Sequence, residues 1–231
     1  MIKIGNIDVF GWETAIRGMR NPMNSWDKSD SKWGCNSPGE TLCAGDCGEW
    51  CTGWSYVIGK NDLSLMKKLA KAGNDHGKFA RMINVTCDIT APLYWWKEHD
   101  TYKVGTVANS CSTMHKIHSK EFTLDDFSCE HLIDDDTTGH LASRYRQSLN
   151  DTIDCLNCAR EQYLKTNDKK YWWQMIQLLP SSYNQRRTVQ LNYQVLWSMY
   201  QRRKDHKLDE WKEFCKWVRT LPYWKEIYLE D

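Results

Sequence analysis

The residues that decide the fold are TCDITAPLYWWKEHDTYKVGTVANSCSTMHK, at positions 86–116. They continue an alternating segment whose apolar side chains are Ile83, Val85, Cys87 and Ile89. Such alternation predicts a half-buried β-strand, which Pro92 is expected to end. A Trp pair and a polar run follow. An apolar wall beside dense hydrogen-bonding groups suits a small-molecule site, although a core strand followed by a polar surface loop has the same composition.

Further elements are predicted on both sides of this strand. Alternation predicts strands over residues 3–10 and 182–191. Helical spacing of apolar residues predicts helices over residues 12–19, 61–73, 141–165, 169–179, 192–203 and 208–221. Asn61 is the expected N-cap of its helix, and Gly73 is the expected left-handed residue after its end. The pattern predicts an α+β domain over residues 1–231, with an antiparallel or mixed sheet flanked by long helices.

The bulk properties exclude several classes of protein. The net charge of +1 argues against a general binder of nucleic acid. The sequence has no apolar run long enough for a membrane span, and we expect no membrane partner. The N-terminus lacks the pattern of a signal peptide, so a cytoplasmic protein is expected. Ten cysteines in a reducing compartment are expected to stay free or to hold metal, with disulfides in an exported protein as the alternative.

Residues 24–56 are interpreted as a Cys-rich insertion, dense in Ser, Asp, Gly and Cys. A long loop of this kind needs a stabilising feature such as a metal. Its four thiols fit a tetrahedral zinc site, although their spacing is not the usual C-x-x-C pair. An iron–sulfur cluster, disulfides or free thiols would use the same residues, which are Cys35, Cys43, Cys47 and Cys51. Cys155 and Cys158 are expected to be buried thiols of a long helix.

Two ordered segments resemble the flavin-dependent thymidylate synthase family, often called ThyX. The first combines a helix, His76, a strand, Ala91-Pro92 and a site loop that contains His99, Asn109 and Ser112. The second has Leu179-Pro180, a strand, and a helix that begins at Asn192. The chain looks most like a diverged, phage-type branch of that family with a Cys-rich insertion.

The resemblance implies a ThyX-like fold, a homotetramer, and FAD bound between subunits. It also implies reductive methylation of dUMP or a related pyrimidine nucleotide, with methylenetetrahydrofolate as carbon donor and NADPH as reductant. The residues implied to bind FAD are His76, His99, Lys103, Asn109 and Asn192. Those implied to bind substrate are Ser110, Ser112 and Arg186, and those implied to be catalytic are Gln194 and Ser112.

The sequence departs from the family at several cationic positions. Glu98 and Asp100 replace the arginines on either side of His99, and Met114, Ile176 and Gln194 stand where the family has others. Losing such charge-assisted bonds weakens phosphate binding, and two acids would add repulsion. Nearby cations either restore a rearranged anion site or are ordinary surface charges; they are Lys97, Lys103, Arg186 and Arg187.

Each implied site residue also has a purely structural interpretation. His76 and His99 fit structural histidines at the ends of elements, Asn109 and Ser112 are common in turns, and Asn192 is a natural helix N-cap. The alternative functions are therefore a catalytically inactive ThyX-fold protein for binding or assembly, and an interaction module built on the Cys-rich insertion.

Overall fold

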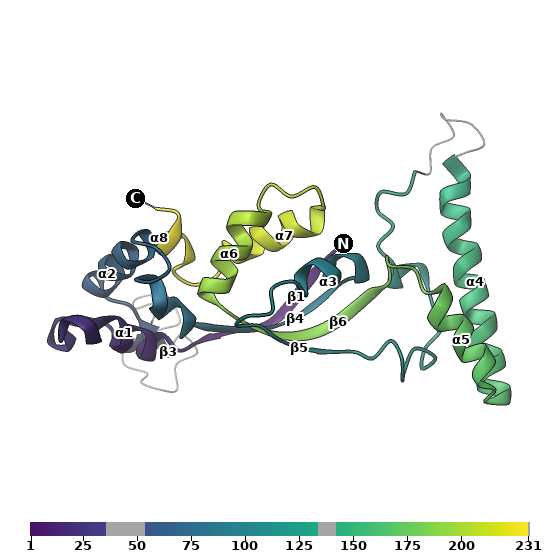
Figure 1. Cartoon of the computed structure of the whole chain (residues 1–231), viewed down its shortest axis with the longest axis horizontal. Coiled ribbons are helices and arrows are strands. Elements are labelled where there is room, and N and C mark those ends of the chain that lie inside the picture. The colour runs from purple at the N-terminus through teal and green to yellow at the C-terminus, as the bar shows by residue number, and fades with distance from the viewer. Residues whose placement is uncertain (36–53, 134–141, 231) are drawn as a thin grey trace.

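The chain folds around a four-stranded antiparallel sheet in a computed structural model that describes residues 1–35, 54–133 and 142–230 (Figure 1). The strands are β1 (Lys3–Phe10), β4 (Asn84–Pro92), β5 (Val107–Ser110) and β6 (Asn184–Asn192), in the order β1-β4-β6-β5. β4 and β6 pair from Asn84 opposite Asn192 to Pro92 opposite Asn184. The predicted α+β fold class is confirmed, and the sheet is antiparallel.

Eight α-helices surround this sheet in the described part of the chain. They are α1 (Trp12–Arg20), α2 (Lys60–Lys71), α3 (Leu93–His99), α4 (Ala142–Thr166), α5 (Lys169–Leu178), α6 (Tyr193–Arg203), α7 (Asp209–Val218) and α8 (Trp224–Tyr228). In Figure 1, α6 and α7 lie over one face of the sheet, and α1, α2 and α8 gather at one end. The α4–α5 pair stands at the other end (Figure 1). None of the helices described is long and apolar enough to cross a membrane.

The main core lies between one face of the sheet and the helices that cover it. Val85, Cys87 and Ile89 of β4 point into it and are fully buried, as the alternation predicted. Trp95 and Trp211 meet there with ring centroids 4.8 Å apart. The Trp pair at positions 95–96 is therefore part of the core and belongs to α3, a helix that the sequence analysis did not predict.

A second hydrophobic cluster holds the α4–α5 pair against the segment that follows β5. Helix α4 contributes a buried stripe that consists of Leu149, Ile153, Leu156 and Ala159. Met175 of α5 and Phe122 complete the contact. Cys155 and Cys158 lie outside the stripe and are exposed, so the prediction that they are buried is wrong.

The opposite face of the sheet carries a polar network centred on Asp88 of β4. Its carboxylate accepts hydrogen bonds from Asn6 Nδ2 at 2.6 Å, Thr188 Oγ1 at 2.5 Å and Arg186 Nη2 at 2.5 Å. Hydrogen bonds from Thr188, Asn6 and Arg186 hold the pKa of Asp88 well below its usual range. The network ties three strands together and fixes where Arg186 points.

Helix α2 begins at Lys60 after Gly59, so the prediction that Asn61 is its N-cap is wrong. The neighbouring Asp62 is buried and binds Arg20 Nε at 2.6 Å. Gly73 does take the left-handed conformation after the helix, with φ of 99°. The N-terminal donors of α2 turn instead to Asp30, whose carboxylate accepts from the backbone amides of Asn61 and Asp62.

The two described ends of the Cys-rich insertion form β-strands that pair with each other. Strands β2 (Lys32–Cys35) and β3 (Trp54–Val57) form an antiparallel hairpin, and Trp33 packs edge-on against Tyr56. Cys43, Cys47 and Cys51 lie outside the described residues. The division of the chain into one domain with an insertion stays a prediction.

Candidate functional site

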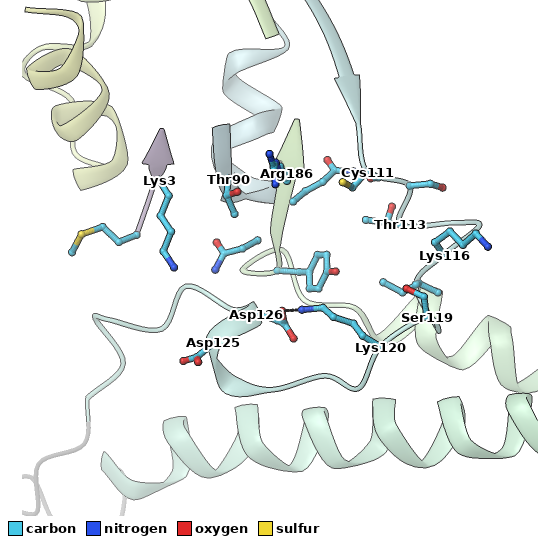
Figure 2. A pocket seen from close by; sticks show the side chains of 16 residues that line it. Lys3, Thr90, Cys111, Thr113, Lys116, Ser119, Lys120, Asp125, Asp126 and Arg186 are labelled. Carbon is cyan, nitrogen blue, oxygen red and sulfur yellow. Dashed lines mark hydrogen bonds and ion pairs between the residues drawn. The ribbon is translucent and has the colours of Figure 1, made fainter. Parts of the chain in front are cut away.

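Four of the implied site residues line two cavities at opposite ends of β6. The first, which we call the Ser112 cavity, has a volume of about 490 Å³ and lies where β6 begins (Figure 2). Its lining contains the implied substrate residues Ser112 and Arg186. The rest of its lining is Met1, Lys3, Thr90, Cys111, Thr113, Lys116, Ile117, Ser119, Lys120, Asp125, Asp126, Tyr183, Asn184 and Gln185.

The loop that carries Ser112 is fixed to the start of β6 by hydrogen bonds. The amide of Cys111 donates to the Arg186 carbonyl at 2.9 Å, and Gln185 Nε2 donates to the Cys111 carbonyl at 2.7 Å. Ser112 Oγ then accepts from the amides of Met114 and His115, which turns the chain. Ser112 is thus a turn former, and the turn itself forms a wall of the cavity.

Basic side chains outnumber acidic ones around the Ser112 cavity. Lys120 is paired with Asp126, and Arg186 is held by Asp88 on the polar sheet face. Lys3 and Lys116 make no ion pair with a described residue. Two uncommitted ammonium groups, several hydroxyls and the Tyr183 ring form a surface that suits an anionic ligand with a flat ring.

The second cavity, which we call the Asn192 cavity, has a volume of about 430 Å³ and lies where β6 ends and α6 begins. Its lining is Asn74, Arg81, Val104, Gly105, Asn192, Gln194, Val195, Trp197, Ser198, Gln201 and Arg202. Asn192 is the N-cap of α6, because its Oδ1 accepts from the amide of Val195 at 3.0 Å. The predicted N-cap role of Asn192 is therefore confirmed, and its Nδ2 stays available as a donor.

Gly105 closes one side of this cavity at short range. Its φ of 76° favours glycine, and a Cβ there would lie 2.8 Å from Asn192 Nδ2 and 3.0 Å from Val195 Cγ2. Across the cavity, Arg81 Nε donates a hydrogen bond to Gln194 Oε1. Arg81 is the last residue of the 3-10 helix η4 (Gly77–Arg81), which directly precedes β4.

His99 lines neither cavity. It is 2% exposed, lies between Trp95 and Trp96 with ring centroids about 5 Å away, and its Nε2 has no hydrogen-bond partner in the described part of the chain. Burial lowers the pKa of His99 to about 4, so the ring is neutral at pH 7. In this arrangement His99 is a core histidine at the end of α3.

The two acids beside His99 are both neutralised inside the fold. Glu98 Oε2 accepts from Arg203 Nη1 at 2.6 Å and from Trp211 Nε1 at 3.1 Å. Asp100 Oδ1 accepts from Arg187 Nη1 at 2.7 Å. Both carboxylates therefore serve structural ion pairs. The repulsion that the sequence led us to expect between these acids and a phosphate is reduced by their partners.

The remaining implied residues are exposed. Asn109 and Ser110 lie on the edge strand β5, opposite Thr188 and Arg187. Lys103 lies in the loop before β5, and His76 lies just before η4. None of the four lines the Ser112 or the Asn192 cavity.

Residues that sequence reasoning passed over complete both cavities. Arg81, Cys111, Lys116 and Lys120 are among the lining side chains. Lys116 and Cys111 flank the motif residue Ser112, which was an available signal. Arg202 follows Gln194 on the helix that the sequence predicted. Arg81 becomes a neighbour of Gln194 only through the pairing of β4 with β6, and one sequence carries no such signal.

The described residues contain no group of three or more His, Cys, Asp or Glu side chains arranged to hold a metal ion. Of the four thiols proposed for zinc, only Cys35 is described. The zinc site in the insertion stays a prediction that rests on residues outside the described ranges.

Comparison with solved structures identifies the fold. Thymidylate synthase X (ThyX) from Helicobacter pylori, solved with FAD and dUMP, superposes with a TM-score of 0.65 and 14% identity, over 100% of this chain and 98% of that one. A UMP/dUMP methylase, PolB from Streptomyces cacaoi, bound with 5-Br dUMP, superposes with a TM-score of 0.57 and 13% identity, over 99% of this chain and 92% of that one. No family model and no curated protein matches the sequence. The chain has the ThyX-like fold, as its motifs indicated.

Proposed function

We propose that this protein methylates dUMP or a related pyrimidine nucleotide in a flavin-dependent reaction, with methylenetetrahydrofolate as carbon donor and NADPH as reductant. The observation that carries the proposal is the meeting of Ser112 and Arg186 in one basic cavity of a ThyX-like fold. The two residues come from the two segments that the resemblance singled out. They lie 74 positions apart in sequence, and a hydrogen bond from the Cys111 amide to the Arg186 carbonyl brings them together.

The Ser112 cavity is the proposed site of the pyrimidine nucleotide. Its uncommitted cations, Lys3 and Lys116, would bind the phosphate as point charges. The hydroxyls of Ser112, Thr113 and Ser119 supply further polar groups around the sugar and base. Arg186 is tied to Asp88 and would act as a positioned wall more than as a mobile clamp.

The Asn192 cavity suits a phosphate-containing cofactor such as FAD, because its described lining has arginines and amides and no carboxylate. Asn192, together with the exposed His76, Lys103 and Asn109, would hold FAD. When bound, FAD supplies the hydride of the methylation. Gln194 would donate from Nε2 to the edge of the pyrimidine, because its Oε1 already accepts from Arg81 Nε.

The two cavities lie at opposite ends of β6, and this separation supports a site that is completed by more than one copy of the chain. We propose a homo-oligomer, a tetramer by resemblance, in which the Ser112 cavity of one copy faces the Asn192 cavity of another. Ser112→Ala and Gln194→Ala chains would each be inactive alone. Unfolded together and refolded as mixed oligomers, they would regain a measurable fraction of wild-type activity, because some sites would receive two intact halves.

The direct test is turnover. The purified protein, supplied with FAD, NADPH, methylenetetrahydrofolate and dUMP, is expected to yield a nucleotide methylated at C5, detected by mass spectrometry. Lys116→Gln should raise the KM for dUMP about tenfold, because a charge-assisted bond to phosphate is lost. Absence of product with dUMP, dCMP and UMP would reject the enzymatic proposal.

One observation favours a second possibility, an inactive protein that keeps the fold for binding or assembly. Arg186 and Arg187, which the sequence suggested as replacement cations, are committed to Asp88 and Asp100. Nucleotide binding without any turnover would support this second function.

A further inference from the structure

We propose that Arg81, oriented by Gln194, binds a phosphate group of a nucleotide in the Asn192 cavity, with Arg202 as the second cation. Arg81 would thereby supply from another part of the chain the positive charge that position 194 lacks. The identity of the nucleotide rests on the proposed function. The presence of a phosphate site does not.

The arginines of the Asn192 cavity differ in their partners from other arginines of the fold. Four other arginines in the described residues are paired with carboxylates, namely Arg20 with Asp62, Arg186 with Asp88, Arg187 with Asp100 and Arg203 with Glu98. Arg81 and Arg202 have no carboxylate partner within the described ranges, and no described residue that lines their cavity is acidic. Two arginines in one cavity without a counter-ion repel each other, and an anionic ligand would relieve that repulsion.

The side chains of Arg81, Asn192 and Gln194 present mainly hydrogen-bond donors to the cavity. The bond from Arg81 Nε occupies Gln194 Oε1, and the amide of Val195 occupies Asn192 Oδ1. The atoms that stay available on these three side chains are Arg81 Nη1 and Nη2, Gln194 Nε2 and Asn192 Nδ2. All four are donors. These four unpaired donors, beside two cations, favour a ligand rich in acceptor oxygens, which a phosphate group is.

The guanidinium of Arg81 is bound through Nε, and its two terminal nitrogens have no hydrogen-bond partner among the described residues, so they can serve as a fork. A planar fork binds two phosphate oxygens at once. Arg81 itself is exposed, so it reaches the ligand from the rim of the cavity without a large desolvation cost. Gln194 acts as a positioning residue that holds the fork in place.

Isothermal titration of the full-length protein tests the proposal with two pairs of ligands. The first pair is dUMP and deoxyuridine, and the second is FAD and riboflavin. We expect Arg81→Gln to weaken binding of the phosphorylated member of one pair by about tenfold or more, and to leave its phosphate-free counterpart within about twofold. The affected pair identifies whether the phosphate belongs to substrate or cofactor. Arg219→Gln, an exposed change at the end of α7, is the matched control.

A charge exchange separates binding from structural effects. In the double variant Arg81→Gln, Gln194→Arg the cation moves to the other side of the same hydrogen bond, and most of the lost affinity should return. Equal weakening of both members of a pair, no effect of Arg81→Gln on any ligand, or failure of the wild-type protein to bind either phosphorylated ligand would each overturn the proposal. Phosphate-dependent binding without turnover would keep this site and reject the enzymatic proposal alone.

Discussion

Arg81 Nε donates a hydrogen bond to Gln194 Oε1, although 113 positions separate the two residues. The pairing of β4 with β6 explains this proximity. Asn84 lies opposite Asn192 at the ends of both strands, so the residues just before β4 and just after β6 are neighbours. The amide of Tyr193 also donates to the carbonyl of Ile83 at 3.0 Å, which fixes the same corner. The Asn192 cavity is thus a consequence of strand register.

Asn192 has two separable roles, and two substitutions should distinguish them. Asn192→Ala removes the N-cap of α6 and should lower the free energy of unfolding by about 0.5–2 kcal/mol in urea titrations. Asn192→Asp keeps a capping oxygen but replaces the donor Nδ2 with a negative charge. It should retain stability and lose binding of the phosphorylated ligand. Full binding by Asn192→Asp would show that Asn192 only caps the helix.

Gly105 and Gly73 form a matched pair for testing the shape of the cavity. Both residues have positive φ, 76° at Gly105 and 99° at Gly73. A Cβ added at Gly105 would contact Asn192 and Val195, whereas a Cβ added at Gly73 would have no atom within 4 Å. Both alanine variants should lose about 1–2 kcal/mol of stability from backbone strain. Gly105→Ala alone should also weaken nucleotide binding, measured by titration. Equal binding by the two variants would contradict the contact.

The buried pair of Arg20 and Asp62 should stabilise the N-terminal part of the fold. Burial pushes the pKa of Asp62 upward, but hydrogen bonds from Ser31, Ser29 and Arg20 outweigh it, and the net pKa is lowered. Removing one partner leaves a buried charge, so Asp62→Ala should reduce the free energy of unfolding by about 3–5 kcal/mol. Asp209→Ala, which breaks an exposed pair with Lys212, should change it little in the same urea titrations.

His99 should make stability depend on pH. Its pKa is about 4 in the folded chain, below the ordinary value of 6.5, mainly because of burial. Asp100, which would favour the proton, and Arg187, which would oppose it, are the charged groups nearby. As the pH falls from 6.5 to 4, the unfolded chain binds a proton at His99 and the folded chain does not. The folded state is therefore destabilised over this interval, and the free energy of unfolding falls by about 3 kcal/mol in total.

The check is to compare urea unfolding at pH 7, 6 and 5 for the wild type and His99→Phe. The variant should lose less stability across this interval than the wild type does. His115→Gln, at an exposed position, should follow the wild type. Identical pH dependence of His99→Phe and the wild type would contradict the assignment of His99 as a neutral core residue.

Cys111 offers a label inside the Ser112 cavity. Its side chain is exposed, whereas Cys87 and Cys215 are buried, and burial raises the pKa of both of those thiols to about 12. Iodoacetamide should therefore modify Cys111, and dUMP should slow that reaction several-fold, as measured by peptide mass spectrometry. Cys155 and Cys158 on α4 should react at a rate that dUMP does not change. Unchanged labelling of Cys111 at saturating dUMP would place the nucleotide elsewhere.

The sequence was informative where long periodic segments meet the core. The alternation from Ile83 to Ile89 predicted β4 and its buried face, and the stripe of α4 predicted the longest helix. Helix α3 was missed because seven residues give too few turns for a periodic signal, and its Trp pair fits a strand equally well. Asn61 was misassigned because Asp30, far away in sequence, caps α2 in its place.

The candidate site was predictable only in part. Of the residues implied by the resemblance, Ser112, Arg186, Asn192 and Gln194 line the two cavities, and their roles stay predictions. The others line neither cavity; they are His76, His99, Lys103, Asn109 and Ser110. The burial of His99 depends on Trp95 and Trp96, whose packing follows from α3. The pairing of Glu98 with Arg203 and of Asp100 with Arg187 joins residues about a hundred positions apart. Such contacts arise from tertiary structure and are not visible in local patterns.

The measurement that tests the central claim most directly is the absorbance spectrum of the full-length protein during titration with FAD and then dUMP. The account predicts flavin bands that stay with the protein through gel filtration and shift when dUMP is added, since both ligands share one composite site. A protein that neither retains FAD nor alters its spectrum with any pyrimidine nucleotide would contradict the claim that this ThyX-like fold carries out flavin-dependent nucleotide chemistry.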